Sequence, residues 1–145
     1  MPKPLVLLSS CLIVLALAGC NTTVTNTQTP LPTSATVTSD ENGKTVTVAV
    51  GATITATLAA NPTTGYEWSL PTIPDTRVVK FVSSNYQAPT SGAMGASGTT
   101  TFIFQAIGAG ITPVRLTYAR SFAPQDNPSF FTFTVVAKPQ VKAAP

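Results

Sequence analysis

The chain is organised around the stretch Asn61-Pro62-Thr63-Thr64-Gly65-Tyr66-Glu67-Trp68, in which a polar turn runs directly into a strand. Pro62 fixes its own φ and Gly65 can adopt a positive φ without a steric clash, so the turn is bent and preshaped. Tyr66 and Trp68 point to the same side of an extended segment, because side chains alternate along a strand. We therefore expect a rigid loop on an aromatic base, with Trp68 as its anchor in the core.

Short segments of alternating apolar and polar residues lie on both sides of this turn, and no long segment has helical periodicity. The alternation predicts strands at residues 44–50, 53–60, 66–70, 77–86, 99–106, 111–118 and 129–137. Seven short strands at roughly even spacing, with Trp68 early on the third, are typical of an immunoglobulin-like fold. We predict an all-β sandwich of two antiparallel sheets without a disulfide.

The apolar residues of these strands predict the core. The residues expected to face inward are Val46, Val48, Val50, Ile54, Ala56, Leu58, Phe102, Phe104, Val114, Leu116, Tyr118, Phe131, Phe133 and Val135. Pro113 cannot donate a hydrogen bond to a neighbouring strand, so the first residues of its strand are expected at an edge or a bulge.

The beginning of the chain has the layout of an export signal. Residues 1–19 contain one lysine, an apolar run and small residues before Cys20. The sequence Leu17-Ala18-Gly19-Cys20 resembles the bacterial lipoprotein box, in which the cysteine is acylated and becomes the first mature residue. We predict a lipoprotein signal peptide at 1–19, lipidation of Cys20 and a membrane-anchored protein of the bacterial cell envelope; an ordinary secretory signal is the alternative. Asn21 is not the aspartate associated with inner-membrane retention, which slightly favours the outer membrane.

The segments that flank the predicted strands have little capacity to bury a core. Residues 20–39 are rich in Thr, Asn, Gln, Ser and Pro, which predicts a flexible tether after the lipidated cysteine. Residues 40–138 form the predicted sandwich domain, and residues 139–145 are predicted to be a disordered tail.

Composition argues against catalysis. The chain has no histidine, and of its two cysteines Cys11 belongs to the predicted signal peptide while Cys20 is the predicted lipidation site. The folded part therefore lacks a thiol nucleophile, the commonest general base and the commonest metal ligands. Its carboxylates are not spaced as a glycosidase pair or a calcium loop. We expect no enzymatic activity, cofactor, metal or small-molecule substrate, and an enzyme is the least favoured of the functions considered.

Binding to nucleic acid is also disfavoured, because the cations are scattered along the chain and form no basic cluster. The glycines in residues 92–98 do not have the spacing of a nucleotide-binding loop. This segment is either a flexible hairpin connection or a loop whose small residues let a partner approach closely. Alternate connections of a sandwich emerge at the same end. The connections at 61–65, 88–98 and 119–128 should therefore lie together.

The three connections resemble a known family. The stretch at 61–68 is similar to the Asn-Pro-Thr-Thr-Gly-(Tyr or Phe)-x-Trp signature of chagasin-type inhibitors of papain-like cysteine peptidases. The family's glycine-rich second loop is approximated by Gly95-Ala96-Ser97-Gly98, which leads into a Thr/Phe-rich strand. Its third loop is Arg-Pro-Trp after a Leu-x-Tyr strand. Here that loop is Arg120-Ser121-Phe122, which keeps the arginine but not the proline or the tryptophan.

The resemblance, which covers about residues 44–137, implies a reversible, non-covalent inhibitor that lays three loops across a peptidase cleft. The central loop, Asn61 to Tyr66, would place Thr63, Thr64 and Gly65 over the catalytic Cys-His pair. The second loop would lie on the unprimed side of the cleft, and Arg120 and Phe122 would face the primed side. The implied partner is a papain-like cysteine peptidase.

The individual loop residues also have structural interpretations. We expect the Asn61 side chain to stabilise the turn by hydrogen bonds, and Tyr66 to pack in the core with Trp68. Thr63 and Thr64 have no evident structural role, which favours contact with a partner. Arg120 is either a solvated charge or an anchor. The altered third loop keeps open an alternative function, a non-inhibitory protein-binding module anchored in the envelope.

Overall fold

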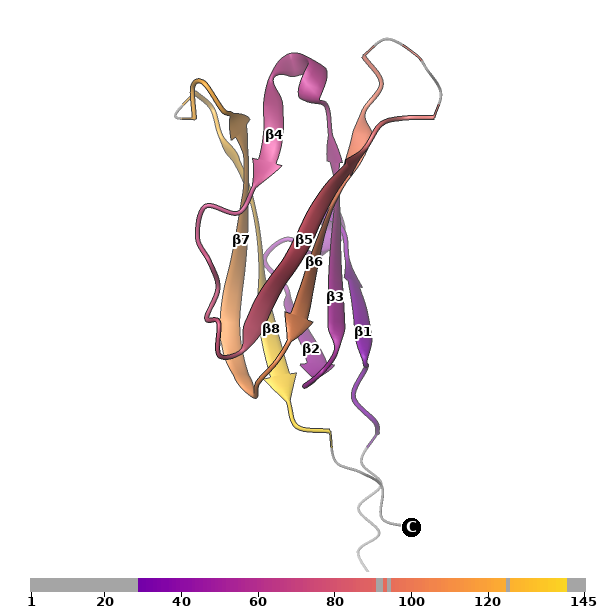
Figure 1. Cartoon of the computed structure of the whole chain (residues 1–145), viewed down its shortest axis with the longest axis vertical. Helices are drawn as coiled ribbons and strands as arrows, with labels where there is room; N and C mark the ends of the chain where they lie inside the picture. The colour runs from indigo at the N-terminus through magenta and orange to yellow at the C-terminus, as the bar shows by residue number, and fades with distance from the viewer. Residues whose placement is uncertain (1–28, 91–92, 94, 125, 141–145) are drawn as a thin grey trace, which may run out of the picture.

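Two four-stranded sheets pack face to face in the computed structural model of the chain (Figure 1). The structure describes residues 29–90, 93, 95–124 and 126–140. The predicted signal peptide, Cys20 and most of the predicted tail lie outside the described residues. Within the described residues, no helix is long and apolar enough to span a membrane.

The first sheet has the strand order β1-β3-β6-β5 and the second the order β2-β8-β7-β4. The strands of the first sheet are β1 (Ser34–Val37), β3 (Thr53–Ala60), β6 (Gly98–Ala106) and β5 (Val79–Gln87). Those of the second sheet are β2 (Thr45–Ala49), β8 (Ser129–Lys138), β7 (Gly110–Arg120) and β4 (Tyr66–Ser69). Two short 3-10 helices, η1 (Ser39–Glu41) and η2 (Pro62–Thr64), lie in the connections after β1 and β3.

The predicted all-β sandwich is confirmed, but the described residues form eight strands, and the pairing is not purely antiparallel. Strand β1 pairs in parallel with β3, and β2 pairs in parallel with β8. Strand β1 lies inside the predicted tether, so the folded domain begins before residue 40. Its four residues are too few to show a periodicity in a Thr/Ser-rich segment. The strand is stabilised by pairing with β3 and by Val37, which is fully buried between the sheets.

The core forms where the inner faces of the two sheets meet. Most of the predicted inward residues are buried, and the largest fully buried side chains are Phe102, Phe104, Phe133, Ile54 and Leu116. Val46, Val50 and Tyr118 are only partly buried. Along β5 the alternation fails, because a register shift between Phe81 and Ser83 interrupts the pairing with β6. Phe81 and Val82 are therefore both exposed, whereas Val79 is buried.

Pro113 lies where β7 has a neighbour on one side. It is opposite Thr134 of β8, while β4 pairs only with residues 117–120 of β7. Because no described strand pairs with β7 on its other side at this position, the missing N–H group of the proline costs no hydrogen bond between strands. The expectation of an edge position for this part of the strand is confirmed.

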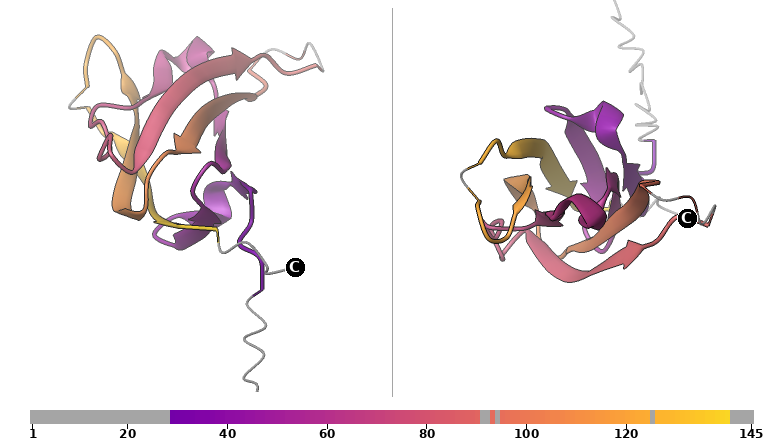
Figure 2. Two further views of the ribbon diagram at one scale, coloured as in Figure 1. Left: turned by 60° about the horizontal axis from the view of Figure 1, so that its bottom comes forward. Right: turned by 90° about the horizontal axis from the view of Figure 1, so that it is seen from above.

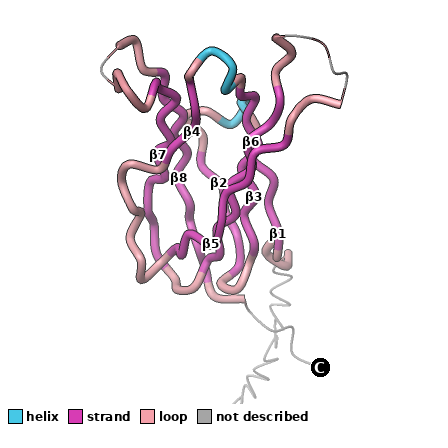
Figure 3. Tube along the Cα trace, turned by 45° about the horizontal axis from the view of Figure 1, so that its top comes forward, coloured by secondary structure: helices cyan, strands magenta, loops and turns pink. Residues whose placement is uncertain are grey.

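The three connections singled out from the sequence emerge at the same end of the sandwich (Figures 1 and 3). Seen from above, the β3–β4 connection lies between the β5–β6 and β7–β8 connections (Figure 2). The described residues at both ends of the chain lie at the opposite end (Figure 1). The predicted co-location of the three loops is confirmed, because alternate connections of strands crossing the sandwich must share an end.

Candidate functional site

The central loop is one turn of 3-10 helix with a polar N-cap and a glycine C-cap. Asn61 is the N-cap, and its Oδ1 accepts hydrogen bonds from the backbone N–H of Thr63 at 3.3 Å and from its hydroxyl. Pro62 occupies the first helical position, where its missing N–H costs nothing. Gly65 ends the turn with a φ of 80°, and its N–H donates to the carbonyl of Pro62 at 2.9 Å. The prediction of a bent, preshaped turn is confirmed.

The two threonines of this loop stabilise it. The hydroxyl of Thr63 donates to Oδ1 of Asn61 at 2.5 Å, and that of Thr64 donates to the carbonyl of Asn61 at 2.7 Å. The expectation that these residues have no structural role is wrong, because each hydroxyl closes a local hydrogen bond of the kind that shapes turns. Both side chains are exposed, so each also presents surface to a partner.

Asn61 connects the central loop to its surroundings. Its side-chain Nδ2 donates to the carbonyl of Gly95 in the β5–β6 connection at 3.0 Å. Its backbone N–H donates to the hydroxyl of Tyr118 on β7 at 2.9 Å. The predicted structural role of Asn61 is confirmed, and the side chain additionally joins two of the three loops.

The predicted second loop divides between a turn and a strand. Gly95 has a φ of 82°, and the N–H of Ala96 donates to the carbonyl of Ala93 at 3.2 Å. Ala96 and Ser97 follow this turn and remain accessible to solvent. Gly98 is buried and begins β6, opposite Ala60. It is therefore a strand residue at the base of the loop and not a surface residue.

The third loop closes on itself directly after β7. The N–H of Ala123 donates to the carbonyl of Arg120 at 3.1 Å, and the N–H of Asp126 donates to the carbonyl of Ala123 at 3.0 Å. Ser121 and Phe122 are the two central residues of the first turn and are exposed, with 76% of the Phe122 surface accessible. Phe122 is therefore the large aromatic side chain that this loop presents.

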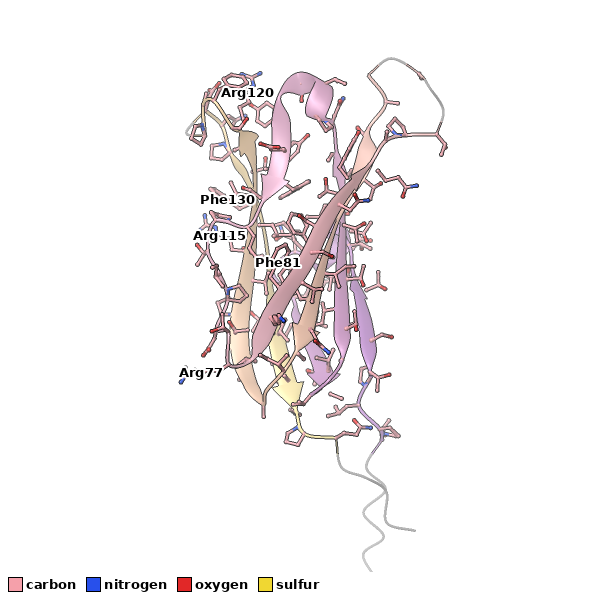
Figure 4. All side chains as sticks on the ribbon, viewed as in Figure 1. Arg77, Phe81, Arg115, Arg120 and Phe130 are labelled. Atoms are coloured by element: carbon pink, nitrogen blue, oxygen red, sulfur yellow. The ribbon has the colours of Figure 1, made fainter. Side chains whose placement is uncertain are left out.

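Arg120 is held against β4 and the third loop. It lies opposite Tyr66 in the β4–β7 register, and its guanidinium carbon is 4.7 Å from the centre of the Tyr66 ring. Its Nη1 is 3.2 Å from Oδ2 of Asp126. Figure 4 shows Arg120 at the loop end of the molecule. Of the two interpretations left open by the sequence, a freely solvated charge is excluded by these contacts.

An aromatic cluster supports the central loop. The Tyr118 ring lies 5.4 Å from that of Tyr66 and 4.9 Å from that of Trp68, measured between ring centres. Trp68 packs against the hydrophobic core and donates its indole N–H to the carbonyl of Ala59 at 2.9 Å. Trp68 is thus the expected core anchor. Tyr66 is half-buried and contacts Tyr118 and Arg120, so its expected place inside the core is corrected.

The third loop also touches the central one. A Cβ built on Gly65 would lie 3.1 Å from Cε1 of Phe122, so the phenyl ring covers the open face of that glycine. Tyr118, which accepts a hydrogen bond from Asn61, and Asp126, which bonds to Tyr66 and Arg120, were not singled out from the sequence as site residues. No local pattern identifies Asp126, because its contacts depend on how two connections meet in space.

The loop end offers surface for contact and few groups for catalysis. No group of three or more His, Cys, Asp or Glu residues within the described part of the chain could hold a metal ion. The ion pair at this end, between Arg120 and Asp126, is engaged in holding the third loop. The accessible groups at this end include hydroxyls, small side chains and the Phe122 ring.

Comparison with known proteins assigns the family. Residues 47–136 match the family described as chagasin family peptidase inhibitor I42. The chain belongs to the chagasin family of peptidase inhibitors. Chagasin from Trypanosoma cruzi is 39% identical over 102 residues, which cover 67% of this chain and 90% of chagasin.

Solved structures show the same fold. A cysteine protease inhibitor from Entamoeba histolytica aligns with a TM-score of 0.64 and 24% identity, covering 74% of this chain and 99% of that chain. The structure of PbICP-C in complex with falcipain-2 aligns with a TM-score of 0.56 and 14% identity, covering 72% and 99%. The family consists of peptidase inhibitors, so this member is an inhibitor and not an enzyme.

Proposed function

We propose that this protein is a reversible, non-covalent inhibitor of papain-like cysteine peptidases and that its three clustered loops fill the active-site cleft. The observation that carries the proposal is that the three loops emerge together (Figure 1), with Asn61 of the central loop bonded to Gly95 of the second loop and to Tyr118 on β7, the strand that leads into the third loop. Loops held in one arrangement before docking lose little conformational entropy on binding.

The central loop acts as a wedge. Its narrow 3-10 turn exposes Thr63 and Thr64 at the tip, where they would lie over the catalytic Cys-His pair of the peptidase. The carbonyls of Asn61 and Pro62 accept hydrogen bonds from Thr64 and Gly65 within the turn. These peptide groups are therefore held in a closed turn and are not presented as an extended substrate. Substrate is excluded without a covalent bond to the inhibitor.

The flanking loops extend the contact on both sides of the wedge. Ala96 and Ser97 present small side chains that let the peptide backbone approach the unprimed side of the cleft. On the primed side, the exposed Phe122 ring supplies an aromatic anchor, a residue class that buries much surface in interfaces. Phe122 is smaller than the tryptophan of the family motif and has no indole N–H.

Titration against papain tests the proposal. The purified soluble part of the chain, residues 21–145, should inhibit papain at micromolar or lower concentration, and peptidase activity should return on dilution because no covalent bond forms. Thr64→Arg should abolish most of the inhibition, whereas Thr76→Arg, an identical change near the opposite end of the sandwich, should not. Absence of inhibition at tens of micromolar would refute the proposal.

We further propose that the protein is anchored in the bacterial envelope through a lipid on Cys20, with the outer membrane as the favoured site. The described chain begins at the end of the sandwich opposite the three loops, which is consistent with loops that point away from the membrane. Residues 20–28 span at most about 30 Å when extended, so the domain would remain near the surface. Cys20→Ala should move the protein from the membrane fraction to the soluble fraction, and retention in membranes would contradict the anchor.

A further inference from the structure

We propose that Asp126 is a positioning residue, which holds the third loop closed and thereby keeps the Phe122 ring against the central loop at Gly65. Asp126 does not itself need to touch a peptidase for this role. The inhibition test of this inference rests on the proposed function, whereas the structural test does not.

Three hydrogen bonds fix Asp126 from different sides. Its N–H donates to the carbonyl of Ala123 at 3.0 Å, and its own carbonyl accepts from the Tyr66 hydroxyl at 3.4 Å. Its carboxylate accepts from Nη1 of Arg120 at 3.2 Å. One residue thus connects the end of the third loop to the last residue of β7 and the first residue of β4.

Arg120 occupies a position that needs an acidic partner such as Asp126. Its guanidinium lies over the Tyr66 ring, and its Nε is buried without a hydrogen-bond acceptor among the described residues. An unsatisfied buried donor opposes this placement. The charge-assisted bond to Asp126 and the stacking on Tyr66 favour it. Without the carboxylate, we expect the guanidinium to turn outward to water.

The position of the Phe122 ring also depends on the closed conformation of the third loop. Its ring is largely exposed, so packing in the core does not hold it, yet Cε1 lies 3.1 Å from the Cβ position of Gly65. Cγ of Arg120 lies 3.9 Å from that same position. The arginine stem and the phenyl ring together cover the face of Gly65. If Arg120 turns outward and the loop opens, both groups leave this face.

The closed conformation of the third loop also compensates for a difference between this sequence and the family motif. In the family motif a proline follows the arginine and restricts the backbone, whereas this chain has Ser121, whose φ is free. The bonds made by Asp126 restrict the loop from its far end. Part of the preorganisation that proline provides locally is therefore supplied here by tertiary contacts.

Nuclear magnetic resonance of the Asp126→Asn variant tests the structural part. The Phe122 ring current should displace the Gly65 Hα resonance in the native chain, and the variant should move that resonance toward its random-coil value. The same shift should appear in the native chain when salt is raised from about 0.05 to about 1 M, because the ion pair is exposed and screened. Asp40→Asn, the matched loss of an exposed carboxylate in η1, should leave Gly65 unchanged.

Inhibition of papain tests the functional part. Asp126→Asn should raise the inhibition constant by about three- to fivefold, as expected for the loss of an exposed ion pair. In a Phe122→Ala background the same change should have an effect of less than about twofold, because coupled residues are non-additive. An equal effect in both backgrounds would mean that Asp126 contacts the peptidase directly, which would overturn the proposal.

The two measurements separate the possible failures. An unchanged Gly65 resonance in Asp126→Asn and in high salt would overturn the positioning role, whatever the inhibition shows. If the native chain does not inhibit papain, the proposed function fails, and the Gly65 resonance still decides whether Asp126 holds the loop.

Discussion

The side-chain amide of Asn61 donates a hydrogen bond to the carbonyl of Gly95 at 3.0 Å and thereby joins the central loop to the β5–β6 connection. The other end of the same amide, Oδ1, caps the 3-10 turn through Thr63. One side chain thus performs two tasks with different atoms, and substitution can separate them.

Asn61→Asp should weaken inhibition while leaving the turn intact. Aspartate keeps the oxygen that caps the turn, and Asp and Asn are similarly good N-caps. It replaces the donor to Gly95 by an acceptor, which repels the carbonyl and releases the second loop. We expect the inhibition constant for papain to rise by about tenfold, equivalent to about 1.4 kcal/mol. Thermal unfolding should be close to that of the native chain.

Asn61→Ala is the comparison variant, because it removes both the cap of the turn and the donor to Gly95. Loss of an N-cap typically costs about 1 kcal/mol, so this variant should also unfold at a lower temperature. If Asn61→Asp and Asn61→Ala inhibit as well as the native chain, the link to Gly95 does not organise the binding surface.

Thr64→Val should weaken inhibition modestly, whereas Thr64→Ser should retain it. Valine keeps the shape of the side chain but loses the hydroxyl that donates to the carbonyl of Asn61 at 2.7 Å. A hydrogen bond of this kind contributes about 0.5–1.5 kcal/mol, so the inhibition constant should rise by less than about tenfold. Full inhibition by the valine variant, measured against papain, would show that the bond does not shape the loop.

Gly98→Ala should destabilise the fold at the base of the second loop. A Cβ at this position would lie 2.3 Å from the carbonyl oxygen of Gln87, and this backbone atom cannot move aside cheaply. We expect a loss of at least about 2 kcal/mol in urea denaturation, as for an overpacked core position.

Gly43→Ala is the control for the glycine at position 98. Gly43 has a φ of 77° and nothing within 4 Å of its Cβ position, so only backbone strain of about 1 kcal/mol is expected. A cost for Gly98→Ala no larger than that for Gly43→Ala would contradict the close packing of β5 on β6.

Asp75 should make the fold sensitive to acid. The Arg77 side chain donates to both carboxylate oxygens of Asp75, at 3.0 and 2.7 Å, and the Arg77 N–H donates at 2.9 Å. These bonds lower the pKa of Asp75 from 3.8 to about 2. Figure 4 shows Arg77 at the end opposite the three loops.

Because the folded pKa lies below the unfolded one, the unfolded chain binds more protons between the two values. The contribution of Asp75 is complete above the unfolded pKa, near 4, and is lost as the pH falls to about 2. Asp75→Asn should therefore show a smaller fall in melting temperature over this range than the native chain. Equal falls would show that this ion pair does not contribute to acid sensitivity.

Much of the fold follows from local patterns in the sequence. The alternation of Ile54, Ala56 and Leu58 predicts a strand at 53–60, and β3 has these bounds. The pattern fails for β1, whose four residues gain stability only when paired beside β3. It also fails along β5, where the register shift after Phe81 leaves both Phe81 and Val82 exposed, although alternation alone would place these neighbours on opposite faces.

In the candidate site, too, some features follow from local sequence and others do not. Pro62 and Gly65 limit the backbone by their own stereochemistry, so the bent turn is evident from the sequence. The roles of Thr63 and Thr64 within the turn were missed, because a threonine in a loop can equally direct its hydroxyl to a partner. Asp126 could not be identified, since its contacts with Tyr66 and Arg120 require the third loop to fold back over β4.

By itself, the sequence determined the turn at 61–65, the aromatic base beside it, most of the strands and the family signature, because these depend on local backbone restriction and period-two burial. Only the tertiary structure decided the parallel pairings, the link from Asn61 to Gly95 and the closure of the third loop by Asp126. The last two join residues 34 and 60 positions apart in the chain. Such contacts are set by which strands become neighbours and in which register, and no local pattern specifies that geometry.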